Sequence, residues 1–298
     1  MISTIIWRVK EAFSVFIGKK KTLPTPKNIT RPPLGIHNLP PISESMRKYK
    51  STIDELSIEF IFSEFKEERV NAGGADLAGY SRLDPSLSTL KHYFPNAKYT
   101  VYSDFDLKID GVDLQKINTP ALENKNNHPR YFYHLADYYK FQGMLNSKAD
   151  IAISIDSDMF VFSEEIYRLI ILTKKFGFCV PNSSALSMNF EIKTSLDTVA
   201  IHDDSNGFGT TVNITPMTFC TQSIDGKSFY EECCKIFEKE PSRASIVMWK
   251  AAWNTSKFPY LLPKEFCVCR GSEGIGNEVL LHVGHPTVAN YYNIIEKK

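Results

Sequence analysis

Short apolar runs alternate with helix-like amphipathic stretches along much of the chain after residue 56. Residues 57–62, 98–103 and 151–155 are rich in β-branched or aromatic side chains, which is typical of buried strands. A helix beginning near Asp84 separates the first two runs, and an apolar stripe of helical period over 130–145 precedes the third. Strands that alternate with helices in this way predict an α/β fold.

Two acidic residues stand directly behind the third strand. Asp156 and Asp158 follow the apolar run 151–155, and a second apolar run, 159–162, follows them. Ligands of open α/β sheets bind outside the carboxyl ends of the strands, so both residues are expected at the mouth of a cleft. In an extended backbone their side chains point the same way and can face one hard cation.

The Asp-x-Asp triplet is a weak signal when it is taken alone, since about one is expected by chance in a chain of this length. A second copy, Asp104 and Asp106, leads into a polar stretch and predicts a strand-end turn. A turn with solvated carboxylates is the alternative for Asp156 and Asp158 as well. The apolar runs on both sides favour a metal-diphosphate site at that pair.

The helix predicted over 130–145 carries charge beside its apolar stripe. Arg130 and Asp137 lie two turns apart, so they share a face, and both could line the cleft. The alternative is a charge pair on the helix surface, which contributes little to stability.

The N-terminal part of the chain has a different pattern. Residues 1–21 predict an amphipathic helix with a basic flank, too interrupted by charge for a membrane span or a signal peptide. It would lie on a lipid surface, on a partner or on the protein itself. Six prolines between residues 24 and 41 predict an extended linker over 22–50, and the catalytic domain is expected over 51–298.

Composition narrows the class of protein. The 298 residues carry 35 Lys and Arg against 34 Asp and Glu. This near balance gives no overall positive electrostatic field that would favour binding to nucleic acid. Six cysteines are scattered without a Cys-x-x-Cys pair, which predicts reduced, mostly buried thiols. The expected setting is the cytoplasm, with membrane association through the N-terminal helix.

These motifs together resemble the GT-A glycosyltransferases over most of residues 56–285. The resemblance is carried by Arg130, by Ala136 and Asp137 on a helix, and by a strand that ends in Asp156-Ser-Asp158. It implies a mixed sheet flanked by helices and a nucleotide-sugar donor, with UDP as the nucleotide. It also implies a glycan or glycoconjugate acceptor with a reactive hydroxyl group.

The resemblance also implies roles for individual residues. The end of the first strand, Phe62 to Glu64 with Ser63 between them, would hold the nucleoside base. Arg130 and Asp137 would contact the sugar nucleotide, while Asp156, Ser157 and Asp158 would bind the ribose and a divalent metal. Such a metal would be Mn²⁺ or Mg²⁺.

Two further groups of residues are candidates for this chemistry. His282 ends an apolar run and resembles the C-terminal histidine that ligates the metal in several GT-A families, with His285 as second choice. The glycine spacing matches only in part, and a structural histidine is the alternative. Asp203 and Asp204 are the candidates for a catalytic base, ahead of Glu191. No acid precedes the late helix, where many GT-A enzymes have one.

Two other functions remain as alternatives. A sugar-phosphate nucleotidyltransferase uses a similar sheet, but it would normally show a glycine-rich, basic loop after the first strand. Residues 63–68 are acidic instead. A non-catalytic transferase-like binding module is the other alternative, and the intact acidic motif speaks against it.

Overall fold

The computed structural model describes residues 39, 41–67, 83–124, 127–187, 209–269 and 278–283, without the side chains of 183–187, 210 and 211. Several predictions fall on residues outside these ranges. They are the amphipathic helix over 1–21, most of the proline-rich linker, the candidate bases Asp203, Asp204 and Glu191, and His285.

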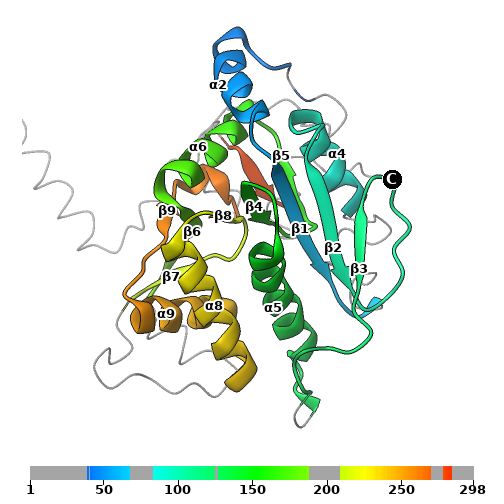
Figure 1. Cartoon of the computed structure of the whole chain (residues 1–298), viewed down its shortest axis with the longest axis vertical. Helices are drawn as coiled ribbons and strands as arrows, with labels where there is room; N and C mark the ends of the chain where they lie inside the picture. The colour runs from blue at the N-terminus through cyan, green and yellow to red at the C-terminus, as the bar shows by residue number, and fades with distance from the viewer. Residues whose placement is uncertain are drawn as a thin grey trace, which may run out of the picture. The chain divides into compact units, whose positions relative to one another are not determined.

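A mixed β-sheet with helices on both faces forms the core of the structure (Figure 1). The strand order is β3-β2-β1-β4-β8-β6-β7, and β9 pairs with β6 beside this path. The first four strands in this order are parallel to one another, whereas β8 is antiparallel to β4 and β6. The predicted α/β class, with a mixed sheet flanked by helices, is confirmed. The strands of this sheet are β1 (Ile58–Glu64), β2 (Lys98–Ser103), β3 (Asp113–Lys116), β4 (Ile151–Ser154), β6 (Phe178–Ser187), β7 (Thr210–Val212), β8 (Met217–Cys220) and β9 (Tyr260–Leu262).

Strand β1 is buried along its whole length because both faces of the sheet are covered. Phe60 and Phe62 belong to one hydrophobic cluster, and Ile61 belongs to the other, as the alternation of a strand requires. The first cluster packs under α2 (Glu44–Asp54), α4 (Leu83–Tyr93) and α6 (Tyr167–Phe176). The second packs under α5 (Tyr131–Asn146), α8 (Ile224–Lys239) and α9 (Ala244–Thr255).

Helix α2 begins inside the segment that was predicted as linker. Residues 44–50 form its first part, and Met46 is buried against the first cluster. Ser43 caps the helix with its hydroxyl group and also donates to Glu164, from its N–H at 2.6 Å and from its hydroxyl at 2.6 Å. A polar cap and buried residues on one helical face attach this helix to the body of the domain, where the proline count alone predicted a tether.

A second, two-stranded sheet lies at the end of β4. Strand β5 (Met159–Val161) pairs antiparallel with β10 (Leu280–His282), which places His282 opposite Met159. On its other side, β5 is held by side chains of α4. The Ser86 hydroxyl donates to the Met159 carbonyl at 2.7 Å, and the Val161 N–H donates to Thr89 Oγ1 at 3.1 Å. The short 3-10 helices are η3 (Glu164–Ile166) and η4 (Lys264–Phe266).

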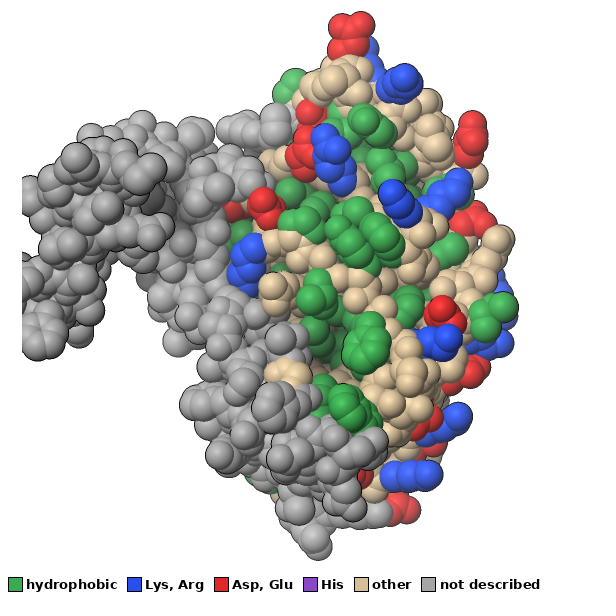
Figure 2. Space-filling view, turned by 90° about the vertical axis from the view of Figure 1, so that its left-hand side faces the viewer, with side chains coloured by type: hydrophobic (Ala, Val, Ile, Leu, Met, Phe, Trp, Pro, Cys, Tyr) green, Lys and Arg blue, Asp and Glu red, His purple; other side chains and the backbone are tan. Residues whose placement is uncertain are grey.

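The surface of the described part carries some exposed apolar side chains. Figure 2 shows hydrophobic side chains spread over the face that carries α6 and β9. Phe176 at the end of α6 stacks on Tyr260 of β9 with ring centroids 3.9 Å apart, and Phe258 is 70% exposed. Within the described ranges, no helix has both the length and the apolar character needed to cross a bilayer.

Candidate metal centre and its surroundings

Asp156 and Asp158 occupy the turn between β4 and β5. The turn is fixed by backbone contacts: the Met159 N–H donates to the Asp156 carbonyl at 3.1 Å, and the Val283 N–H donates to the Asp158 carbonyl at 2.9 Å. The Asp156 N–H donates to Thr215 Oγ1 at 2.9 Å. The side chains of Asp156 and Asp158 are 23% and 13% exposed, so both carboxylates are mostly withdrawn from solvent.

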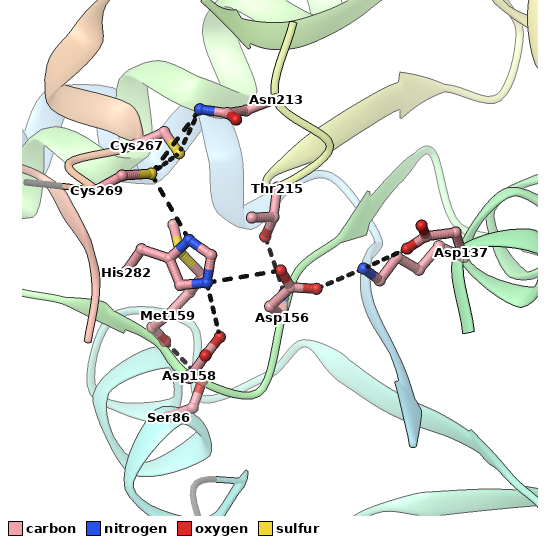
Figure 3. A network of polar contacts seen from close by, with 11 residues as sticks. Ser86, Asp137, Asp156, Asp158, Met159, Asn213, Thr215, Cys267, Cys269 and His282 are labelled. Atoms are coloured by element: carbon pink, nitrogen blue, oxygen red, sulfur yellow. Dashed lines mark hydrogen bonds and ion pairs between the residues drawn. The ribbon is translucent and has the colours of Figure 1, made fainter. Parts of the chain in front are cut away.

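His282 meets this pair from β10. Its Nε2 lies 3.1 Å from Asp158 Oδ1 and 3.9 Å from Asp156 Oδ2. One ligand atom from each of the three residues lies within 4.8 Å of the others. Figure 3 shows the three side chains pointing toward one another. Two carboxylate oxygens and one imidazole nitrogen form a donor set that suits a divalent cation such as Mn²⁺. Burial alone would lower the pKa of His282, but Asp158 raises it well above its usual value.

Lys140 of α5 is a member of this group that the sequence analysis missed. Its Nζ lies 2.5 Å from Asp156 Oδ1 and 3.2 Å from Asp137 Oδ1, so it joins the predicted helix acid to the predicted metal site. The lysine side chain is only 6% exposed. A signal existed in the sequence: Lys140 follows Asp137 by three residues and stands between Tyr139 and Phe141 in an otherwise apolar part of the helix.

The charges of this group depend on one another. Burial alone would lower the pKa of Lys140, but Asp156 and then Asp137 raise it, and the net shift is upward. Burial raises the pKa of Asp137, Asp156 raises it further, and Lys140 opposes both. The lysine is therefore a buried cation within ion-pair distance of both acids, and it opposes the upward shift of the Asp137 pKa.

The end of β1 is tied to the helix that carries Asp137. Ser63 donates its hydroxyl to the Ala136 carbonyl at 2.7 Å, and both Ser63 and Glu64 are buried. The Phe62 side chain is fully buried and packs into the first hydrophobic cluster, so its ring faces the core and not a nucleoside base.

Arg130 and Ser157 are the remaining residues that were predicted to contact a sugar nucleotide. Arg130 is the N-cap residue of α5 and is half-buried, two turns before Asp137 as expected. Ser157 is half-buried between the two acids.

The second Asp-x-Asp motif has a separate environment. Asp104 accepts a hydrogen bond from the Lys66 N–H at 2.8 Å, and Asp106 pairs with Lys116 at 2.9 Å. The Asp106 side chain is 82% exposed. This matches the predicted strand-end turn.

A sulfur-containing group lies on the other side of His282. Cys269 Sγ is 3.7 Å from His282 Nδ1 and 3.5 Å from Cys267 Sγ, and Asn213 Nδ2 approaches both sulfurs (Figure 3). The pKa of Cys269 is lowered to about 5, chiefly by its hydrogen bond with Cys267 and also by His282, against the opposing effect of burial. All six cysteines are free thiols, each buried or half-buried, as predicted. The Cys-x-Cys spacing of Cys267 and Cys269 does not by itself indicate this group, because His282 and Asn213 are distant in sequence.

Fold and site together define an α/β protein with two carboxylates and one imidazole gathered at the carboxyl end of a central parallel strand, where they could hold a cation. No protein-family model matches the chain, and no curated protein matches it.

Solved structures of similar architecture exist at low sequence identity. The galactosyltransferase LgtC, solved with donor and acceptor sugar analogues, is 8% identical. It covers 80% of this chain and 97% of its own, at a TM-score of 0.47. Mouse xyloside xylosyltransferase 1 is 10% identical over 78% of this chain and 98% of its own, with a TM-score of 0.46. A 4-diphosphocytidyl-2C-methyl-D-erythritol synthase from Anaerococcus prevotii is 11% identical over 84% of this chain and 98% of its own, with a TM-score of 0.42.

Proposed function

We propose that this protein is a metal-dependent glycosyltransferase of the GT-A type that moves a sugar from a nucleotide-sugar to a hydroxyl group of a glycan or glycoconjugate. The observation that carries the proposal is the meeting of Asp156, Asp158 and His282. His282 lies far along the chain from the two acids, yet it offers its ligand atom within 4.8 Å of theirs. A UDP-sugar is the donor that the resemblance to GT-A enzymes favours.

The donor set fits the metal that the proposal requires. Asp158 and His282 would supply a carboxylate oxygen and an imidazole nitrogen, and Asp156 would supply Oδ2, because its Oδ1 contacts Lys140. Mixed oxygen and nitrogen ligands favour Mn²⁺ over Mg²⁺. When bound there, a divalent ion supplies Lewis-acid neutralisation of the leaving diphosphate.

The chain's own residues would orient the donor. Lys140 holds the Asp156 carboxylate in place, which leaves its second oxygen directed toward His282. Ser63 fixes the helix turn of Asp137 against the end of β1, beside which the nucleoside would lie. Arg130 would add positive charge for the phosphates. Asp203 and Asp204 remain the candidates to take the proton of the acceptor hydroxyl.

The test is a panel of nucleotide-sugars with Mn²⁺, scored for slow hydrolysis of the donor in the absence of acceptor. Asp158→Asn should abolish this hydrolysis and metal-dependent nucleotide binding, because the amide replaces the carboxylate nearest to His282. Asp106→Asn is the matched control, since it alters the same position of the other Asp-x-Asp motif and should leave hydrolysis unchanged.

Circular dichroism should show that both variants keep the wild-type fold. Wild-type turnover in Asp158→Asn would refute the proposal. So would a protein that hydrolyses no donor but makes nucleotide-sugars from a nucleoside triphosphate and a sugar phosphate, because that is nucleotidyl transfer.

A further inference from the structure

The sulfur-containing group beside His282 includes two thiols, Cys267 and Cys269, that have no role in the proposed glycosyl transfer. Cys267 follows η4, Cys269 stands two residues later, Asn213 lies just after β7, and His282 ends β10. We propose that these four side chains form a second metal site, selective for a soft divalent ion such as Zn²⁺. The proposal stands independently of the sugar-nucleotide chemistry.

The distances match a tetrahedral site with sulfur and nitrogen ligands. Zinc bonds of about 2.3 Å to sulfur and about 2.0 Å to nitrogen place two sulfurs about 3.8 Å apart, and a sulfur and a nitrogen about 3.5 Å apart. The observed separations are 3.5 Å between the two sulfurs and 3.7 Å between Cys269 Sγ and His282 Nδ1. The ligand atoms of Cys267, Cys269 and His282 all lie within 4.8 Å of one another.

Asn213 is the fourth side chain of the proposed site, because it approaches both sulfurs. Its amide nitrogen lies 3.4 Å from Cys267 Sγ and 3.8 Å from Cys269 Sγ, again the edge lengths of a tetrahedron. Rotation of the amide by half a turn exchanges Nδ2 for Oδ1, so the same side chain offers a neutral oxygen ligand to a metal. The Asn213 N–H donates to the Pro181 carbonyl at 3.0 Å, which anchors its backbone.

The opposite nitrogen of His282 has the partner that a metal-bound histidine usually has. A ligating imidazole commonly donates its second N–H to a carboxylate, which fixes the ring. Here Nε2 lies 3.1 Å from Asp158 Oδ1 while Nδ1 faces Cys269. Asp158 would therefore orient His282 for the thiolate site.

The two sites then share one ligand. A neutral imidazole has one lone pair for a metal, so an ion on Nδ1 leaves Nε2 as a donor to Asp158 and removes it from the carboxylate site. Zinc at the thiolate site would thus weaken Mn²⁺ binding at Asp156 and Asp158. This last consequence rests on the proposed function.

Co²⁺ is the probe of choice, because tetrahedral thiolate coordination gives it visible and near-ultraviolet absorption. Full-length protein stripped of metal should gain these bands up to one equivalent, with release of the thiol protons, and Zn²⁺ should remove them. Cys269→Ser should lose the bands. Cys220→Ser, which changes a half-buried thiol on β8 outside the proposed site, should keep them.

A measurement on the wild-type protein avoids any variant that fails to fold. Zn²⁺ should protect Cys267 and Cys269, but not Cys220, from alkylation, as read by mass spectrometry. Absence of the thiolate bands, bands unchanged in Cys269→Ser, or equal alkylation with and without Zn²⁺ would overturn the site. Because neither assay contains a nucleotide-sugar, its result is separate from that of donor hydrolysis. An unchanged Mn²⁺ affinity after Zn²⁺ loading, read by electron paramagnetic resonance, would overturn the shared ligand alone.

Discussion

At the scale of single residues, Lys140 decides the charge of the candidate site. It contacts one oxygen of Asp156 and one of Asp137, so both acids have a cation within ion-pair distance. An ion pair that is mostly withdrawn from water is stable only when both charges are present, since either one alone would bear the full cost of desolvation. Within the candidate metal site, Lys140 therefore balances the charge of Asp156. Asp158 and His282 are left as the most available metal ligands.

Replacement of this lysine should be costly. Lys140→Met leaves Asp137 and Asp156 without their cation, and the free energy of unfolding should fall by about 3 to 5 kcal/mol. Chemical denaturation measures the loss, and Lys174→Met on the exposed face of α6 should be nearly neutral. The double variant Lys140→Met with Asp137→Asn should recover part of the stability. A Lys140→Met protein as stable as wild type would show that the ion pairs contribute nothing.

At the scale of elements, β1 is fixed at both ends by polar side chains. Ser63 connects the carboxyl end of β1 to α5, and Glu59 connects the start of β1 to β2 and to the end of α5. The Glu59 carboxylate accepts from Thr100 of β2 at 2.6 Å and from Ser147 at the C-cap of α5 at 2.5 Å. It also lies 3.0 Å from Lys98 Nζ. A buried acid with three partners thus sets how the helix with Asp137 and Lys140 lies on the sheet.

This network predicts a pH dependence of stability. Burial raises the pKa of Glu59, but Ser147, Thr100 and Lys98 lower it more strongly, so its folded pKa lies below the ordinary value of 4.5. The group therefore stabilises the fold fully above its unfolded pKa, and this contribution is lost as the pH falls through the lower, folded pKa.

Glu59→Gln should remove that acid-labile contribution and cost about 1 to 3 kcal/mol at neutral pH. Urea denaturation between neutral pH and pH 3 would measure both effects. Glu231→Gln, in an exposed and weakly paired position on α8, is the control and should change little. Parallel stability-versus-pH curves for Glu59→Gln and wild type would contradict the assignment.

At the scale of the whole molecule, the chain divides into the units Met1–Pro32 and Pro33–Lys298. The boundary falls inside the segment predicted as linker. In the second unit, two hydrophobic clusters cover the two faces of the sheet, and each includes residues of β1 and β4. The described part of this unit therefore has its own core, and its stability should not depend on the first 21 residues.

Deletion of residues 1–21 should leave the free energy of unfolding and donor hydrolysis unchanged. It should lower binding to anionic liposomes, because the amphipathic stripe and the basic flank Lys19, Lys20 and Lys21 are removed. Co-sedimentation with vesicles measures the loss. A control in which the three lysines become glutamines should show how much of the binding is electrostatic. An insoluble truncated protein would mean that the helix belongs to the core.

The hydrophobic pattern alone was enough to place β1, β2, β4 and α5 close to their observed ranges. The three strands are short apolar runs, and the helix has an apolar stripe of helical period, so each element differs in pattern from the segments beside it. It also placed Asp156 and Asp158 behind the central strand, because the apolar run 151–155 stops directly before them. The proline signal is local and predicts a linker that includes residues 44–50, whereas the burial of Met46 depends on a helix far along the chain.

Tertiary structure alone decided which groups meet. Lys140 reaches Asp156 only because α5 packs on β1 and β4, and His282 reaches Asp158 only because β10 pairs with β5. The contact of Cys267 and Cys269 with Asn213 and His282 likewise joins segments that no periodicity links. Local sequence determines the elements because hydrophobic period and caps act over a few residues. Contacts between elements depend on the packing of the whole chain, which no short pattern contains.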